Sequence, residues 1–354
     1  MIRLSPLTQK RLRRFRSIRR GWWSFLLLVF LYVLSFGAEL LINHRALLVS
    51  YQGRLQFPTY GAIIPGTVFG EDYDYETNYR ALRDRFRAEN KGDWVLMPPV
   101  PYGPLENDTR PGLINPSPPS WSNGHWLGTD PVGRDVLARL FYGFRIVMTF
   151  ALAFTVAVYG LAITIGCAMG FFGGWIDLLG QRLIEIWQNI PSLYVIIIGV
   201  SLVPADLAVW VRVSLLLVIM VAFSWAGDSY YLRTATLKEK ARDYVAAVRL
   251  LGAGPSRTIF RHILPNTIAI LVTFLPFAIA GAIYALTALD FLNFGLPRPM
   301  PSWGEMLEIG LGATHAWWIV TFTFLAITVV LLLVTFVGEA IREAFDPRRF
   351  STYQ

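Results

Sequence analysis

The chain alternates between long apolar runs and polar segments. A helix needs about 20 mostly apolar residues to cross the hydrocarbon core of a bilayer. Runs close to that length cover residues 21–41, 146–172, 183–203, 209–226, 267–289 and 317–337. The pattern therefore predicts an all-α membrane protein with six transmembrane helices.

The polar segments divide the predicted fold into four parts. We expect residues 1–42 to hold a basic tail and the first span, and residues 43–145 to form a large outer segment. Residues 146–345 should form a transmembrane domain of five helices, with an inner helix-turn-helix loop at 227–266 between the fourth and fifth spans. The last residues, 346–354, are predicted to be an inner tail.

The outer segment differs in character from the rest of the chain. It is rich in Tyr, Pro and Gly, and prolines recur between residues 98 and 119. Since proline lacks a backbone donor, we expect no long regular element in that stretch. An amphipathic helix over residues 133–145 should follow at the membrane interface, with Asp130 capping the turn before it. Its polar side chains, expected to lie away from the apolar face, are Arg134, Asp135 and Arg139.

The charge distribution predicts the orientation in the membrane. The formal net charge is +8, and the first 20 residues contain eight basic side chains and no acid. Residues 227–266 carry seven basic and three acidic side chains. Basic segments next to membrane spans usually lie in the cytoplasm, so we expect both termini and this loop on the cytoplasmic side. A basic tail placed directly before an apolar run is typical of a contact with membrane lipid rather than of nucleic-acid binding.

Candidate chemistry is sparse. Cys167 is the single cysteine, the four histidines show no ligand spacing, and no Walker A motif is present. We therefore expect no metal site, no catalytic residue and no ATP hydrolysis by this chain. Polar side chains at membrane depth indicate a transport pathway by default. The candidates are Glu185, Gln188 and Asn189 at the inner end of the third span, and Asp290 at the outer end of the fifth.

Each pathway candidate has a plainer interpretation. Glu185 can pair with Arg182 one helical turn earlier, so that both lie at the interface. Asp290 can be the solvated end of a helix.

Residues 242–266 predict two short helices joined by a turn. Asp243 to Leu251 has helix-forming composition, with Val245, Val248, Leu250 and Leu251 on one side, and Gly252 is placed to end this helix in the left-handed conformation. A second helix should run to Ile263, before Pro265 breaks the pattern. A polar helix-turn-helix between two membrane spans indicates a docking element.

This segment resembles the cytoplasmic "EAA" loop of permease subunits of ABC importers, whose pattern is Glu-Ala-Ala, three residues, Gly, nine residues and Ile-x-Leu-Pro. Gly252, Leu264 and Pro265 match at the required spacing. Ala246 replaces the Glu, Val248 the second Ala and His262 the Ile, so one ionic contact to the ATPase is absent. The resemblance implies an ATPase-coupling loop formed by Tyr244, Val245, Ala246, Ala247, Leu250, Leu251, Gly252, His262, Leu264 and Pro265. Of these, Val245, Leu250, Leu251 and Gly252 are expected to form the docking surface and its turn.

Two further stretches, His125 to Arg145 and Pro301 to Leu307, resemble the C-type permeases of dipeptide and oligopeptide importers. The pattern is most similar to the Yej-type branch, linked with uptake of peptides and microcin C. The resemblance implies a multi-pass protein of the bacterial inner membrane that works by alternating access. It further implies a second permease subunit, ATP-binding subunits that carry ATP and Mg, and a periplasmic peptide-binding protein.

Two other classes of protein remain open. A secondary transporter driven by an ion gradient would need buried acids or histidines, of which Glu185 is the only candidate near a path. A membrane enzyme or assembly factor would carry its chemistry in the outer segment, where Asp72, Asp74, Glu76, His125 and Asp130 show no diagnostic spacing. The outer segment itself is either a passive covering of strands and turns or a lid that faces a substrate-delivery protein.

Overall fold

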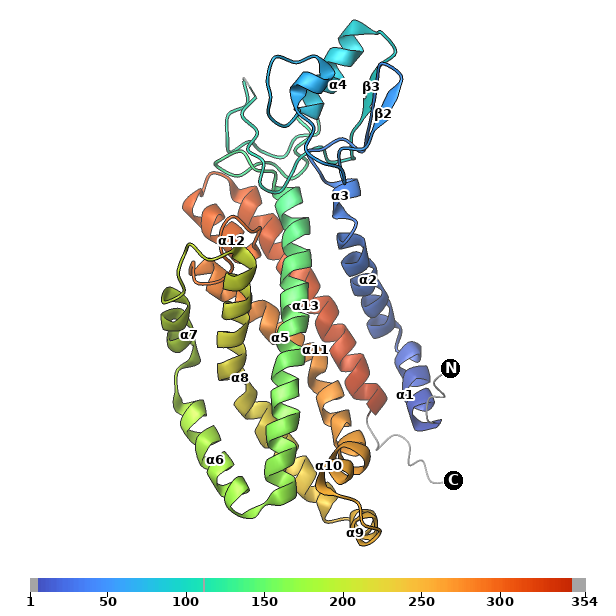
Figure 1. The fold of residues 1–354 in the computed structure, drawn as a ribbon, viewed down its shortest axis with the longest axis vertical. Coiled ribbons are helices and arrows are strands. Elements are labelled where there is room, and N and C mark those ends of the chain that lie inside the picture. Colours follow the sequence, from blue (N-terminus) through green and yellow to red (C-terminus); the bar gives the residue numbers. More distant parts are fainter. Residues whose placement is uncertain (1–5, 111, 346–354) are drawn as a thin grey trace.

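The protein consists of a long helical bundle with a small mixed domain at one end (Figure 1). This computed structural model describes residues 6–110 and 112–345. Both ends of the described chain lie away from the small domain, at the lower half of the bundle in Figure 1.

An N-terminal arm of three helices runs along the bundle. These are α1 (Pro6–Ser17), α2 (Arg19–Ser35) and α3 (Ala38–Leu41). The chain bends by 95° between α1 and α2. The apolar helix α2 ends at Ser35, so the predicted first span to residue 41 is interrupted near Gly37. The arm packs closely on the last helix because Gly21 carries no side chain, and a Cβ there would lie 2.1 Å from that of Ala340.

The small domain at one end of the bundle is formed by the segment predicted to lie outside, and we call it the outer domain after that prediction. It corrects the prediction of an all-α protein. It contains a three-stranded antiparallel sheet in the order β2-β1-β3, made of β1 (Leu48–Tyr51), β2 (Arg54–Gln56) and β3 (Trp94–Leu96). A 3-10 turn (Gly66–Phe69) and α4 (Tyr79–Glu89) pack against it. The buried core of this domain consists of Ala46, Val49, Phe69, Tyr79, Leu82 and Phe86. The segment therefore folds around its own apolar core, which composition alone did not indicate.

The bundle begins with α5 (Val136–Phe172) and continues through α6 (Gly174–Asn189), α7 (Ser192–Ser201) and α8 (Val209–Lys240). The inner turn region holds α9 (Asp243–Leu250), α10 (Pro255–Thr258) and the π-helical turn η2 (Ile259–Ile263). The chain ends with α11 (Leu264–Phe291), α12 (Trp303–Gly312) and α13 (Trp317–Phe345).

The helices support between four and six membrane spans. Within the described residues, four helical stretches are long and apolar enough to cross a bilayer: Val136–Phe172, Val209–Lys240, Pro255–Phe291 and Trp317–Phe345. Two bent pairs, α1 with α2 and α6 with α7, raise the number to six if each pair is one span. The second pair bends by 79° at Pro191, where the ring prevents a continuous helix. The predicted set of spans is thus compatible with the fold.

Several predicted boundaries are wrong. No separate interfacial helix exists over residues 133–145, because this stretch forms the first turns of the 37-residue helix α5. The predicted inner loop at 227–266 starts too early, since α8 continues to Lys240. The last helix α13 continues to Phe345, beyond the end predicted for the sixth span at residue 337 but in agreement with the predicted end of the transmembrane domain. The predicted tail 346–354 lies outside the described residues.

Candidate functional site

The turn between α9 and α10 lies at the end of the bundle opposite the outer domain (Figure 1). Gly252 follows α9 and ends this helix with φ of +83°, the left-handed conformation that the sequence predicted. The backbone N–H of Ala253 donates to the Val248 carbonyl at 3.2 Å, which satisfies a carbonyl at the helix end. Only a residue without a Cβ adopts this geometry without strain.

Val245 anchors the turn to the bundle rather than forming its surface. This side chain is 1% exposed and belongs to a buried cluster with Cys167, Phe171, Ile259 and Ile263. The prediction that it lies on the docking surface is therefore wrong. Leu250 is five residues further along, a rotation of about 140° around the helix, so it points elsewhere.

An apolar tip projects from the turn. Leu250 is 89% exposed and Leu251 is 88% exposed. Ala246 and Ala247 are exposed beside them on α9. We call these four residues the apolar tip. Two bare leucine side chains are unusual on a surface facing water, and they indicate a contact surface for another protein.

Tyr244 holds the base of the turn. Its hydroxyl donates to the Glu239 carboxylate at 2.8 Å and accepts from Asn266 Nδ2 at 3.0 Å, so it joins α8, α9 and α11. Burial, reinforced by the Glu239 carboxylate, raises the pKa of Tyr244 and keeps the hydroxyl neutral as a donor.

The second half of the turn continues directly into a membrane helix. His262 and Leu264 are partly buried and Pro265 is exposed. Residues Pro255–Phe291 form one helical stretch of 37 residues, so the prediction that Pro265 breaks the pattern is wrong. The π-helical turn explains why the helix continues. The Leu264 N–H donates to the Ile259 carbonyl five residues earlier, and α11 starts at Leu264. Pro265 therefore stands in the first turn of α11, where a residue without a backbone N–H is tolerated.

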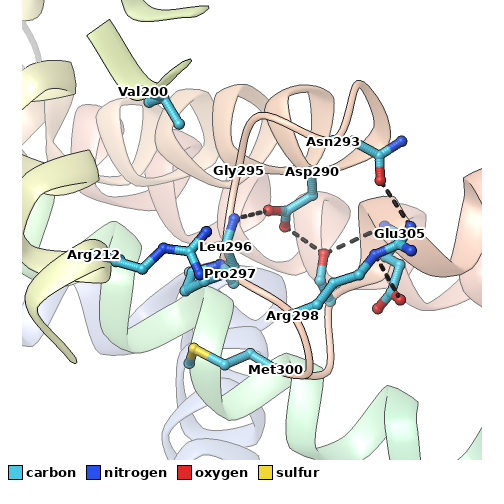
Figure 2. Close-up of a pocket in the computed structure, with 11 residues that line it drawn as sticks. Val200, Arg212, Asp290, Asn293, Gly295, Leu296, Pro297, Arg298, Met300 and Glu305 are labelled. Atoms are coloured by element: carbon cyan, nitrogen blue, oxygen red, sulfur yellow. Dashed lines mark hydrogen bonds and ion pairs between the residues drawn. The ribbon is translucent and has the colours of Figure 1, made fainter. Parts of the chain in front are cut away.

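A cavity of about 380 Å³ lies near the other end of the bundle (Figure 2). Its walls come from α7, α8, the end of α11, the loop over residues 293–302 and the first turn of α12. The charged side chains that line it are Arg212, Asp290, Arg298 and Glu305. Apart from Asp290, none of these was singled out from the sequence, because no local pattern indicates which loop residues face a cavity.

Asp290 organises the loop of this cavity. The carboxylate is 6% exposed and accepts from the Leu296 N–H at 2.6 Å and the Ser302 hydroxyl at 2.5 Å. The interpretation of Asp290 as a solvated helix end is therefore wrong. A buried carboxylate needs hydrogen-bond donors, and the loop supplies them.

Glu305 connects the cavity to α5. Its carboxylate accepts from Arg139 Nη2 at 2.5 Å and lies 3.6 Å from Arg298 Nε. Arg139 is fully buried and also contacts Asp130 at 3.2 Å. Arg139, which was predicted to lie away from the apolar face of this helix, is thus buried in an ionic cluster. Asp130 does cap its turn as expected, accepting from the Val132 and Arg134 N–H groups.

The inner polar residues of the third span are separate from this cavity. Arg182 Nη1 donates to Glu185 Oε2 at 2.5 Å, and both side chains are more than half exposed, so the predicted pairing at an interface is present. Asn189 Nδ2 donates to the Glu185 carbonyl at 2.7 Å, and Gln188 lies next to it on α6. The structure therefore does not bring Glu185, Gln188 and Asn189 together with Asp290.

The outer segment holds a buried imidazole between two carboxylates. His125 Nδ1 lies 2.7 Å from Asp135 and Nε2 lies 3.0 Å from Asp108. Burial alone would lower the pKa of His125, but the hydrogen bonds of Asp108 and Asp135 outweigh it and raise this pKa. Against its own burial, Asp108 has a lowered pKa because His125 and Arg110 donate to it. This cluster joins the outer segment to the start of α5.

Within the part of the chain that the structure describes, this cluster does not form a metal site. Glu76 is paired with Arg45 at 2.5 Å, and Asp74 accepts from the Thr67 hydroxyl at 3.4 Å. Across residues 6–110 and 112–345, no group of three or more His, Cys, Asp or Glu side chains has the geometry to hold a metal ion. Four of the side chains that motivated the membrane-enzyme alternative are therefore engaged in ordinary ion pairs and hydrogen bonds: Asp74, Glu76, His125 and Asp130.

Comparison with known proteins gives consistent results. Residues 162–351 match the family model described as binding-protein-dependent transport system inner membrane component. The chain is 40% identical over 349 residues to the inner membrane ABC transporter permease protein YejE of Escherichia coli, covering 99% of each chain. It is 38% identical to the peptidoglycan transport system permease protein YejE of Agrobacterium fabrum, over 98% of this chain and 94% of that one.

A shorter relative is the dipeptide transport system permease protein DppC of Haemophilus influenzae, 34% identical over 72% of this chain and 85% of the relative. Relatives of this kind favour a permease of an ABC system over an ion-driven transporter. The family match covers more than half of the chain, and two relatives match it from end to end. This chain therefore belongs to the family of binding-protein-dependent transport system inner membrane components.

Proposed function

We propose that this chain is the permease subunit of an ATP-driven importer that passes peptides across the bacterial inner membrane by alternating access. The observation that carries the proposal is the apolar tip. Two exposed leucines project from a turn whose second arm is continuous with a membrane helix of 37 residues. A protein that docks on this tip can therefore tilt that helix.

The tip should receive an ATP-binding subunit. Tyr244 and Val245 fix the tip to α5, α8 and α11, so a displacement of the tip is passed to the helices rather than absorbed by a loose loop. ATP and Mg would be bound by the partner subunits. ATP must favour one orientation of the permease by differential contacts, since equal binding to both orientations shifts nothing.

The remaining partners follow from the family. A second permease subunit would complete the path between two bundles, and a periplasmic binding protein would deliver cargo to the outer domain. We assign residues 43–135 to this outer domain and residues 136–345 to the transmembrane domain, with both termini in the cytoplasm. The basic residues that precede α2 support this orientation.

The cargo class rests on the relatives and on the outer cavity. Relatives named for dipeptide and for peptidoglycan transport suggest peptides, and conjugates such as microcin C fall in the same class. The cavity combines basic and acidic side chains with apolar walls, which suits a short peptide better than a simple ion. Asp290 belongs to this pathway in our proposal. Glu185, Gln188 and Asn189 would lie at its inner end.

The test is recovery of the tagged protein from membranes in a mild detergent, followed by intact-mass measurement of what accompanies it. We expect an ATP-binding subunit and a second multi-span permease, together with peptide uptake that stops when ATP is depleted. Recovery of the chain alone, with uptake that survives ATP depletion and collapses with the proton gradient, would instead establish a secondary transporter.

A further inference from the structure

The charged side chains of the outer cavity are not equally engaged. Asp290 has a donor on each carboxylate oxygen. Glu305 accepts from Arg139, and Arg298 lies beside Glu305 and donates to Asn293 at 2.9 Å. These three groups hold the loop together and are occupied by one another or by their neighbours.

Arg212 is different. It stands in the first turn of α8 and extends toward the turn formed by Leu296 and Pro297 (Figure 2). The side chain is partly buried, and among the described residues it takes part in no hydrogen bond or ion pair. It also lines a small adjoining cleft against Val203 and Leu216. A guanidinium held on cavity walls without an anionic partner is set up to bind an anion.

We propose that Arg212 receives the terminal carboxylate of a peptide that enters the cavity from the outer side. This inference rests on the proposed function, since it names the group by which the cargo is held. A guanidinium presents parallel N–H donors that match the two oxygens of a carboxylate. Val200, Pro297 and Met300 supply apolar walls for the neighbouring side chain, and a cavity of about 380 Å³ lies within the range of small-ligand sites.

The first experiment measures the uptake of two peptides by three variants of the complete importer. Uptake of a tripeptide with a free carboxylate and of the same tripeptide with a terminal amide is measured for Arg212→Gln, and each rate is divided by that of the unaltered protein. The preference of the binding protein cancels in these ratios. We expect the ratio for the free carboxylate to fall about tenfold, the effect of one lost charge-assisted hydrogen bond, and the ratio for the amide to stay near one. Arg212→Lys should recover part of the loss.

Arg298→Gln is the matched control, because it removes the same charge from the same cavity but from a side chain that already has partners. It should change uptake of both peptides by the same factor. An equal fall for both peptides in Arg212→Gln would overturn the inference and would leave Arg212 with a structural or lipid-facing role.

A second measurement does not depend on transport of the amide. In a Cys167→Ala background, which removes the single native cysteine, Pro297→Cys beside the intact Arg212 is exposed to tripeptides with free termini that carry a thiol-reactive side chain on the first or the last residue. Labelling should be faster when the group is at the carboxyl end, whereas a cysteine in place of Arg182 should show no such preference. Equal labelling from both ends would contradict the inference. Absence of any ATP-dependent peptide uptake by the unaltered importer would instead overturn the proposed function.

Discussion

Arg139 Nη2 lies 2.5 Å from Glu305 Oε2, although the two residues are 166 positions apart in the sequence. This ion pair joins α5 to α12. Both side chains are buried, and Asp130 completes the pair from the turn before α5. The two stretches that each resembled a peptide permease, His125 to Arg145 and Pro301 to Leu307, therefore meet in one ionic cluster. Trp303 adds to the joint, since its indole N–H donates to the Leu140 carbonyl at 3.0 Å.

Breaking this pair should destabilise the protein strongly. Removal of one member of a buried ion pair leaves an uncompensated charge and typically costs about 3–5 kcal/mol. We expect Arg139→Ala to lower the thermal midpoint of the purified protein in detergent by several degrees. The combination of Arg139→Met with Glu305→Leu should recover much of this loss, because Asp130 keeps Arg134 as its partner and no unpaired charge is then left buried.

The control for this prediction is Arg182→Ala. It breaks a pair whose members are 68% and 54% exposed, and such surface pairs contribute about 0–1 kcal/mol. Equal effects of Arg139→Ala and Arg182→Ala on the midpoint would show that the buried pair has no special role.

Charges placed on the apolar tip should remove the ATP-binding partner without unfolding the protein. Leu250→Asp combined with Leu251→Asp changes side chains that are almost fully exposed, so the folded state loses little. An interface that buries these leucines should weaken by about 2 kcal/mol or more, a factor of roughly 30 in affinity. Co-purification of the partner at graded concentrations measures this change.

Val245→Asp supplies the contrasting variant. Its side chain is buried against Phe171 and Ile263, so the substitution should loosen the turn itself and expose it to protease. If the Leu250 and Leu251 variant retains its partner at full affinity, the tip is not the docking surface.

Gly252 should tolerate no proline. Its φ of +83° is outside the range of a proline ring, so we expect Gly252→Pro to abolish coupled uptake while membrane insertion continues. Gly252→Ala should cost about 1 kcal/mol because of the left-handed backbone. Gly254→Ala is the matched control, since Gly254 has φ of −67° and open space around its Cα. Uptake rate and amount of protein in the membrane check both points, and normal uptake by Gly252→Pro would refute the role of this turn.

The outer segment should be held to α5 most firmly over a limited range of pH. His125 has a folded-state pKa above its ordinary value of 6.5, so its contribution is complete at lower pH and is lost as the pH rises through the folded-state pKa. Asp108 has a folded-state pKa below its ordinary value of 3.8, so its contribution is present above that value and is lost as the pH falls toward the folded-state pKa. Resistance of the outer domain to protease should therefore be highest at mildly acidic pH, between the two ordinary pKa values of 3.8 and 6.5.

His125→Gln tests this expectation. A glutamine keeps hydrogen-bonding capacity but does not titrate, so the decline of protection on the alkaline side should disappear in this variant. A decline that persists unchanged would assign the pH dependence to another group.

Local signals in the sequence predicted local features well. Gly252 predicted a left-handed helix end because few other residues adopt that backbone, and the apolar runs predicted the long helices. The direction in which a side chain faces was harder to predict. Val245 and Leu250 were expected on one side of the helix, although five residues correspond to a rotation of about 140° around α9. Which of them meets the bundle depends on the packing of Val245 against Phe171 of α5.

Long-range pairing could not be predicted from pattern alone. Arg139 has the position of an outward-facing charge on an amphipathic helix, and only the approach of Glu305 makes its burial favourable. Arg212 and Arg298 belong to no local sequence pattern, and their place on one cavity depends on the fold of the loop that Asp290 organises. In the same way, the small core around Phe69 and Tyr79 forms from segments that no sequence period connects.

The stretch Pro255–Phe291 extends from the inner turn to Asp290 at the outer cavity, a length of about 55 Å at the usual helical rise. This one helical stretch therefore connects the turn that carries the apolar tip with the loop that lines the cavity. Thermodynamic linkage then requires reciprocity between them. By whatever factor the docked ATP-binding subunit changes the affinity of the cavity for peptide, a bound peptide must change the affinity of the tip for that subunit, so the presence of cargo is sensed on the far side of the membrane.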